Sequence, residues 1–322
     1  MLSRRELLLG ALGLAAASAL PTQEACKTEP KIKEKPRRPK IETNPYFDSN
    51  PEYLVPVKGG EFSKEEKKHR TEVMPNGETI FHDIGLDLYK VKAGDNPGSI
   101  RESLSKYPQY AHLADQTDKM HSFNIPPTVL QIDMWLPIPL ENKDREMSDE
   151  QFARYAKQGI DDIKGHPQYG EFLKEVIAKI GERDLIATLI AVAKQESGGK
   201  PLGQFEMHRW EKKYKAFSFS MLHILMEKNG PGLSARHNLD MTQGQTYHPR
   251  NAAKLFIGYL VEKTNDPLRL FPIDQHYEKF ASFYNGSDWE STNGDYVVNV
   301  TRYYKEAQAL LEEHPELING DS

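Results

Sequence analysis

Apolar residues recur at three- and four-residue intervals through the C-terminal half of the chain, a spacing typical of amphipathic helices. The pattern predicts helical stretches over residues 151–165, 170–199, 248–263 and 296–314. Gly181 predicts a break within the second of these stretches, and Ser148 with Gln151 matches a capping box ahead of the first. We therefore expect a mainly α domain over residues 146–315.

A shorter unit with a different pattern precedes this domain. The alternation in "LYKVKAG" (88–94) predicts a strand, and Asp95 is placed to cap a helix that follows. A second helix is expected over about 112–122. The segment "MWLPIP" predicts a closing strand at a sheet edge, because proline cannot donate a hydrogen bond inside a sheet. The order strand, helix, helix, strand (βααβ) predicts a small α+β domain over residues 86–140.

The N-terminus carries a targeting pattern. In "MLSRRELLLGALGLAAASAL", an arginine pair precedes an apolar stretch that is too short to span a bilayer and ends in a small-x-small cleavage pattern. Residues 1–19 are therefore interpreted as an export signal, of either the general or the twin-arginine type. The protein is expected in the periplasm, the cell envelope or the extracellular space.

Residues 20–85 read as a linker, basic and proline-rich at first and poorly patterned afterwards. The linker holds Cys26, the only cysteine, which excludes an intrachain disulfide. It is either a lipid-anchored residue or an inert one. No other segment has the length and hydrophobicity of a membrane span, so no stable span is expected once the signal is removed.

Composition and charge exclude several function classes. The formal net charge of −5 gives no general nucleic-acid signal. The eleven histidines are scattered and form no His-Glu-x-x-His pattern, so neither a metal nor a cofactor is predicted.

Glu196 is the residue whose position demands a chemical explanation. Leu185, Leu189 and Val192 fall on one helical face, and Glu196 lies four residues further along the same face. Burial and the negative end of the helix dipole both disfavour a charged carboxylate, so we expect a raised pKa. A carboxylic acid that stays protonated near neutral pH can protonate the leaving oxygen of a glycosidic bond.

Five segments, in order, resemble motifs of the lytic transglycosylase and goose-type lysozyme group. They are "LIAVAKQESGG", "FSMLHI", "HPRNAAKLFIGYL", "ASFYNGS" and "DYVVNVTRYYKEA", and the resemblance covers about Glu182 to Leu311. The family pattern is a helix ending in Glu-Ser, a Gly-Leu-Met-Gln segment, an Asn-initiated helix ending in Tyr-Leu, Ala-x-x-Tyr-Asn-x-Gly and a closing tyrosine-rich helix. The resemblance implies a lysozyme-like helical fold.

The same resemblance implies roles for individual residues. Glu196 would be the catalytic general acid and then base. The residues implied to bind substrate or line the cleft are Ser197, Met221, His223, Tyr284, Asn285 and Tyr303. The hydroxyl of Tyr284 would point toward Glu196. The sequence departs from the family where Ser220 replaces the motif glycine and His223 replaces the motif glutamine.

The unit over residues 86–140 resembles a LysM domain. "YKVKAGDNPGSI" is similar to its opening strand, Gly-Asp turn and first helix, and "IPPTVLQIDMWLPIP" to its closing half. LysM domains bind glycans that contain N-acetylglucosamine. The resemblance implies a groove between residues 94–98 and residues 124–131.

Together these resemblances imply an exported enzyme that cuts peptidoglycan with one carboxylate and leaves 1,6-anhydromuramoyl ends. One alternative is a muramidase that hydrolyses the same bond, for which Glu206, Asp240 or Asp288 would supply a second acid. The alternative from another class is a non-catalytic glycan-binding protein, which the loss of the motif glutamine favours.

Overall fold

The computed structural model describes residues 70–83, 86–114, 129–138, 147–196 and 208–319. These residues all belong to one unit, Ile41–Ser322, of the two into which the chain divides. The predicted export signal, Cys26 and the linker up to residue 69 lie outside the described residues. So do Ser197, Glu206 and most of the 124–131 loop.

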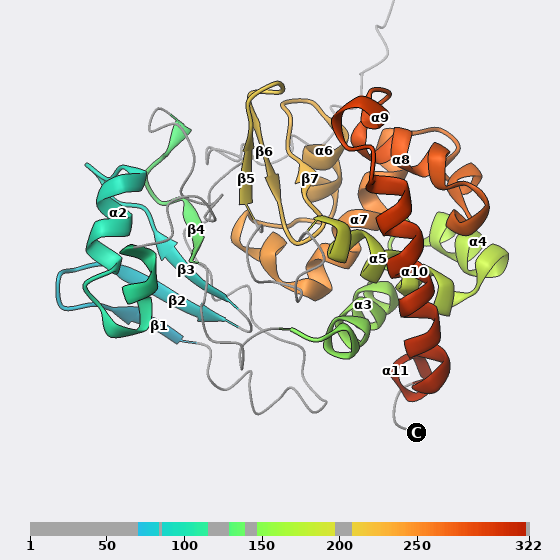
Figure 1. Ribbon diagram of the computed structural model, residues 1–322, viewed down its shortest axis with the longest axis horizontal. Coiled ribbons are helices and arrows are strands. Elements are labelled where there is room, and N and C mark those ends of the chain that lie inside the picture. The colour runs from blue at the N-terminus through green and yellow to red at the C-terminus, as the bar shows by residue number, and fades with distance from the viewer. Residues whose placement is uncertain (1–69, 84–85, 115–128, 139–146, 197–207, 320–322) are drawn as a thin grey trace, which may run out of the picture. The chain divides into compact units, whose positions relative to one another are not determined.

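The described chain is mostly helical and carries two small sheets (Figure 1). The helices are α2 (Pro97–Leu104), α3 (Asp149–Ile163), α4 (Gly170–Ile180), α5 (Glu182–Glu196), α6 (Pro231–Asn238), α7 (Pro249–Lys263), α8 (Tyr277–Asn285), α9 (Trp289–Thr292), α10 (Tyr296–Glu313) and α11 (Glu316–Asn319). The strands are β1 (Arg70–Val73), β2 (Thr79–Asp83), β3 (Leu86–Lys90), β4 (Trp135–Ile138), β5 (His208–Glu211), β6 (Ala216–Phe219) and β7 (Ile224–Leu225).

The first sheet begins earlier than the sequence pattern predicted. Its four strands are antiparallel in the order β1-β2-β3-β4, and the first two come from the segment that was interpreted as linker. Gly77, with φ of 83°, lies in the tight turn between β1 and β2. The Asn76-Gly77 pair is a hairpin signal that the weak alternation of the flanking residues obscured.

The cap of α2 also differs from the prediction. Asn96, not Asp95, is the N-cap, and it forms a reciprocal capping box with Ser99. The carboxylate of Asp95 instead accepts hydrogen bonds from the Tyr89 hydroxyl (2.7 Å) and the Lys92 amide (2.8 Å). In place of the helix expected over 112–122, a 3-10 helix spans Pro108–Ala114, and residues 115–122 lie outside the described ranges.

The prediction that β4 is an edge strand is confirmed. Its outer edge is covered by the buried side chain of Gln243. The Gln243 amide accepts from the Trp135 N–H (3.3 Å) and donates to the Trp135 carbonyl (2.9 Å), as a neighbouring strand would. An uncovered edge exposes such backbone groups to pairing with other chains, so Gln243 closes this edge.

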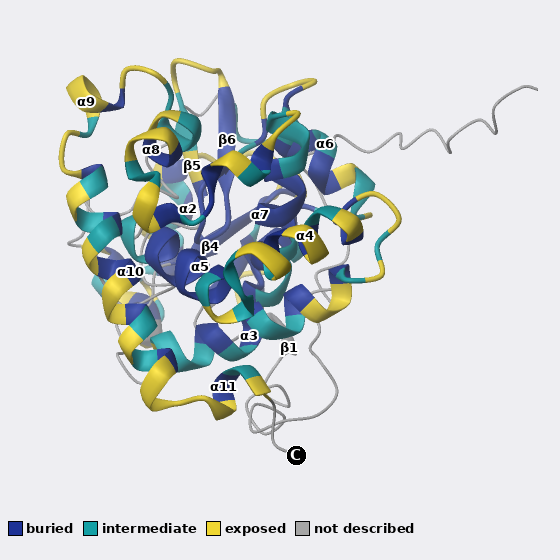
Figure 2. Cartoon of the chain, turned by 90° about the vertical axis from the view of Figure 1, so that its right-hand side faces the viewer, coloured by how far each residue is buried: buried dark blue, intermediate teal, exposed yellow. Residues whose placement is uncertain are grey.

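The helical region is organised around α5, which packs against α3, α4 and α10. Every residue of α5 from Leu185 to Ala193 is buried, as the dark interior in Figure 2 shows. The predicted apolar face is confirmed, but burial extends around the whole helix. The one polar side chain in this stretch, Thr188, donates its hydroxyl hydrogen to the Asp184 carbonyl. The predicted break at Gly181, with φ of 82°, and the capping box of Ser148 and Gln151 are also confirmed.

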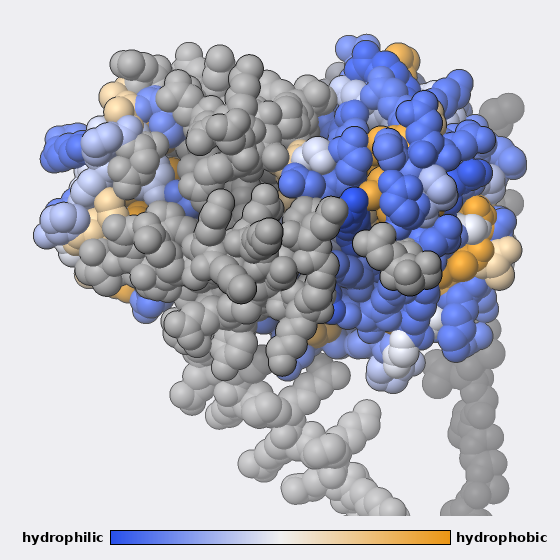
Figure 3. Space-filling view, turned by 90° about the horizontal axis from the view of Figure 1, so that it is seen from below, coloured by the Kyte–Doolittle hydropathy of each residue, from blue (hydrophilic) through white to orange (hydrophobic). Residues whose placement is uncertain are grey.

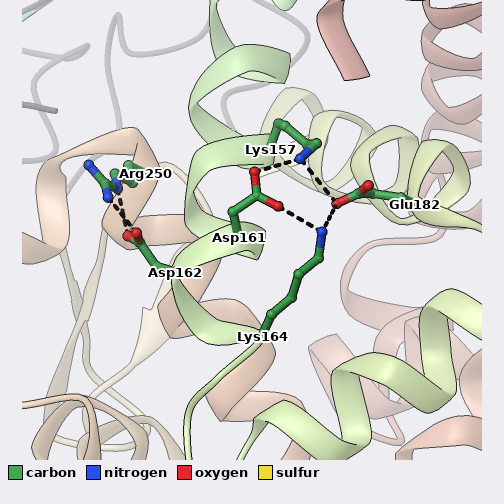
Figure 4. Close-up of polar contacts among 6 residues, drawn as sticks. All are labelled: Lys157, Asp161, Asp162, Lys164, Glu182 and Arg250. Carbon is green, nitrogen blue, oxygen red and sulfur yellow. Dashed lines mark hydrogen bonds and ion pairs between the residues drawn. The ribbon is translucent and has the colours of Figure 1, made fainter. Parts of the chain in front are cut away.

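Ion pairs join α3 to the beginnings of α5 and α7 (Figure 4). Lys164 lies 2.7 Å from Asp161 and 3.0 Å from Glu182, and Lys157 contacts the same two carboxylates. The Arg250 guanidinium contacts both oxygens of Asp162. Because these side chains are partly exposed, each pair contributes at most about 1 kcal/mol to stability. Their main effect is to fix which helix ends meet.

The face in Figure 3 is predominantly hydrophilic over the described helices, with hydrophobic side chains in small groups. None of the helices in the described ranges combines the length and the hydropathy that crossing a bilayer requires.

We predict that Gly159→Ala lowers the free energy of unfolding by about 1–3 kcal/mol. A methyl group at Gly159 would overlap the Arg250 carbonyl where α3 crosses α7, which outweighs the better helix propensity of alanine, about 1 kcal/mol. Urea unfolding monitored by circular dichroism would measure the change. Gly165→Ala is the matched control, because a methyl group there meets no atom; equal stabilities for the two variants would contradict the prediction.

Candidate active site around Glu196

Glu196 is the last residue of α5, and its side chain is 14% exposed. The helix is buried up to Ala193, and Glu196 lies at its end, where solvent still reaches the carboxylate. The helix meets α10 in the opposite direction: Glu196 lies near Tyr296 at the start of α10, whereas Asp184 accepts a hydrogen bond from Gln308 near its end. The predicted raised pKa of Glu196 stays a prediction.

A tight turn after β6 brings His223 to Glu196. The His223 Nδ1 lies 3.4 Å from Glu196 Oε2, and the His223 side chain is 4% exposed. The turn closes through the His223 amide, which donates to the Ser220 carbonyl. Ser220 has φ of 70° and His223 has φ of 44°, so both residues adopt the left-handed conformation. Glycine adopts that conformation without strain, whereas a side chain at either position adds strain.

Three tyrosines from three different helices surround Glu196. Burial raises the pKa of Tyr259 (α7), Tyr284 (α8) and Tyr296 (α10), and the negative charge of Glu196 raises each one further. The rings of Tyr259 and Tyr284 meet edge to face, 6.0 Å apart. The phenols therefore stay protonated at neutral pH, and each has one hydrogen to donate.

Buried polar atoms without hydrogen-bond partners gather at the same place. Glu196 Oε1, Tyr296 Oη and Asn285 Nδ2 are all buried and lack a hydrogen bond of normal geometry. Both Glu196 and Asn285 nevertheless influence the pKa of Tyr296, which places the three side chains close together. Since buried polar groups are nearly always paired in folded proteins, an unpaired group of this kind is typical of a binding or catalytic site.

The remaining residues that the resemblance implied as substrate-binding are not placed by a described contact with the Glu196 carboxylate. The Tyr284 hydroxyl donates to the Leu222 carbonyl, and so holds the turn that carries His223 rather than Glu196 itself. Met221 is 2% exposed and belongs to the core. Tyr303 lies further along α10, with its ring under Lys194 and its hydroxyl accepting from Arg302. Ser197 lies outside the described residues.

Two residues at the site were not singled out from the sequence. Tyr259 lies in the "LFIGYL" segment, and Tyr296 opens the closing tyrosine-rich helix. Both belong to segments that carry the family resemblance, but a tyrosine on an amphipathic helix has no local mark that separates a site residue from a core residue.

A second histidine, His208, lies in the β5–β6 hairpin that precedes the His223 turn. His208 at the start of β5 is fully buried, and its Nδ1 lies 2.6 Å from the Tyr247 hydroxyl, which also accepts a hydrogen bond from Gln243. Burial, with a smaller contribution from the charge of His223, lowers the pKa of His208 to about 3. His208 is therefore neutral, and it connects the β5–β6 hairpin to the Gln243 contact with β4.

Candidates for a second acid do not join Glu196 in the described part of the chain. Asp288 pairs with Lys213 (3.2 Å), Asp240 is exposed, and Glu206 lies outside the described residues. Across the described ranges, no group of three or more His, Cys, Asp or Glu side chains is arranged to hold a metal ion.

Comparison with known proteins assigns no relative to this chain. No family model matches the sequence, and neither a curated protein nor a solved structure matches it significantly.

We predict that acid weakens the fold through His208. Its pKa is lowered from 6.5 to about 3 in the folded protein, so the unfolded chain takes up a proton over this range and the folded protein does not. Stability therefore falls as the pH decreases from about 6.5 to about 3, by up to about 5 kcal/mol from this residue.

The measurement is urea unfolding at several pH values for the wild type and for His208→Gln. Glutamine can still bond to Tyr247 but does not titrate, so the variant is expected to lose less stability over the same range. Identical slopes of stability against pH would contradict the assignment.

Proposed function

We propose that this protein is an exported enzyme that cleaves the β-1,4 glycosidic bond between N-acetylmuramic acid and N-acetylglucosamine in peptidoglycan, with Glu196 as its general acid and then base. The observation that carries the proposal is the largely buried Glu196 carboxylate, which lies beside His223 among three phenols whose pKa burial raises. The ordered motif resemblances support, as our proposal, a lytic transglycosylase or goose-type lysozyme with a lysozyme-like fold.

The surroundings of Glu196 suit this chemistry. Glu196 Oε1 lacks a hydrogen bond of normal geometry, so its proton would not be committed to a strong contact before it passes to the leaving glycosidic oxygen. Tyr296 and Asn285 lie beside Glu196 and could bind polar groups of the sugar. Their burial means that a bound sugar would replace water around the carboxylate, which strengthens each electrostatic interaction.

One carboxylate suffices if the substrate completes the reaction. We propose that the substrate's N-acetyl group assists departure of the leaving group. Glu196, now deprotonated, then takes the proton of the muramoyl 6-hydroxyl as its oxygen attacks the anomeric carbon, which leaves a 1,6-anhydro end. This route needs no external water and therefore no second acid.

The N-terminal sheet unit would serve as a LysM-like module that binds the same polymer. The Asp95 turn, fixed by Tyr89 and Lys92, would form one side of its groove. Holding one part of a glycan strand raises the concentration of its neighbouring bonds at Glu196. Export to the cell envelope or beyond would place both domains at this substrate.

A non-catalytic glycan-binding protein is the second candidate, and a specific observation favours it. His223 stands where the motif has glutamine, and its ring faces Glu196 at 3.4 Å. A histidine there can occupy the carboxylate that must otherwise act on the substrate. Hydrolysis by a muramidase, with a second acid such as Glu206, is the remaining alternative.

We predict that Glu196→Gln reduces peptidoglycan cleavage at least 100-fold while the fold is retained, because the amide keeps the shape but cannot transfer the proton. Purified wild type and variant would be incubated with peptidoglycan and the products examined by mass spectrometry. Anhydromuramoyl ends support the transglycosylase.

Reducing ends would indicate the muramidase instead, and binding without cleavage by the wild type would indicate the non-catalytic protein. Glu306→Gln is the matched control, since this glutamate contacts the same helix, through Lys194, but is half exposed. Undiminished cleavage by Glu196→Gln would remove Glu196 from the mechanism.

A further inference from the structure

Lys263, at the end of α7, is a largely buried cation beside the site. Its Nζ donates to the Tyr259 hydroxyl (2.5 Å) and to the Phe283 carbonyl. It also lies over the rings of these two residues, 4.9 and 4.7 Å from their centroids. No ion pair joins it to a carboxylate within the described ranges. A buried lysine that is held only by neutral oxygens and aromatic rings is costly, because its charge is desolvated without an opposite charge nearby.

Both contacts of Lys263 lead to the residues around Glu196. Tyr259 is one of the three phenols on which the charge of Glu196 acts. Phe283 precedes Tyr284 and Asn285 in the last turn of α8, where helix carbonyls lack partners within the helix. Lys263 therefore caps the end of α8 and fastens it to α7.

The protonation state of Lys263 decides how Tyr259 can bond. An ammonium group has three donors and no acceptor, so the Tyr259 oxygen must accept from it and the phenol hydrogen must point elsewhere. A neutral amine can accept, and the phenol hydrogen can then turn to Lys263 and away from Glu196.

The groups that face Lys263 come from two helices. On α7 the only titratable one is Tyr259, and α8 contributes the ring and carbonyl of Phe283. Glu196 from α5 and Tyr214 from the β5–β6 turn influence Tyr259, one residue further away. Burial alone lowers the pKa of Lys263, to about 8, so the change of state falls within an accessible pH range.

We propose that Lys263 is a positioning residue: its ammonium group holds the Tyr259 hydroxyl and the last turn of α8 in the arrangement that serves Glu196. Its effect on catalysis rests on the function proposed above, whereas its effect on Tyr259 does not.

The test compares Lys263→Met and Lys263→Arg with Lys254→Met. Lys254 is a matched control, since it is also largely buried on α7 but pairs with Asp162, on α3. For peptidoglycan cleavage, Lys263→Met is expected to lower kcat at least tenfold with KM changed by less than about threefold. Lys263→Arg is expected to keep kcat within about threefold, because arginine stays charged and still donates.

The pH profile separates positioning from a general loss of structure. Wild-type cleavage is expected to decline above about pH 8, and Lys263→Arg is expected to move this decline to higher pH. Lys254→Met is expected to leave it in place even where it lowers thermal stability. A wild-type kcat and pH profile in Lys263→Met, or the same alkaline decline in Lys263→Arg, would overturn the proposal.

A readout without catalysis keeps the two proposals distinguishable. In protein labelled with ¹³C-lysine and ¹³C-tyrosine, one lysine signal is expected to titrate near pH 8, and the Tyr259 ring signal to shift at the same pH. Lys263→Arg and Tyr259→Phe assign the two signals. If the wild type cleaves no glycan, the NMR titration alone tests the positioning role. A Tyr259 ring signal that does not shift at the pH where Lys263 titrates would overturn that role.

Discussion

Burial of α5 on every side is the constraint on which the helical region depends. A helix that is apolar around its whole circumference must be enclosed, and α3, α4 and α10 supply the enclosure. Enclosure fixes where the helix ends, and Glu196 is the residue at which it ends. The carboxylate thus receives its position mainly from the packing of the helix, and His223 contacts one of its oxygens.

The unpaired polar atoms beside Glu196 carry a cost that the rest of the structure offsets. Each buried donor or acceptor without a partner costs about 1–3 kcal/mol. Glu196 Oε1, Tyr296 Oη and Asn285 Nδ2 are such atoms, and they come from three helices. The aromatic contacts of Tyr284 with Phe280, Phe256 and Tyr259 hold the surrounding wall in place. A site that is underpaired in a well-packed frame is typical of residues kept for binding or chemistry.

The helices and strands that could be predicted from the sequence are those marked by strong local patterns. The helices with long apolar patterns and the Ser148 capping box were predicted because a few neighbouring residues determine them. The strands β1, β2 and β5–β7 were not, since they are two to five residues long and gain their stability from partners elsewhere in the chain. Asp95 looked as suitable a cap as Asn96, and only the contact with Tyr89 separates them.

The site shows the same division. Glu196 was found because a charged residue on an apolar stripe is a local contradiction. Tyr259, Tyr296 and Lys263 lie where their own helices place apolar or amphipathic residues, and they become site residues only when three helices converge. For such residues, spacing along the chain does not reveal which residues of other helices they contact.

The contact between Gln243 and Trp135 has a consequence for how the molecule unfolds. A side chain acts here as a missing strand, and it comes from a residue 108 positions further along the chain. Separating Gln243 from Trp135 would break the hydrogen bonds among the Trp135 backbone, the Gln243 amide and the Tyr247 hydroxyl. Opening the first sheet away from the helical region therefore breaks these hydrogen bonds, which couples the stability of the two regions.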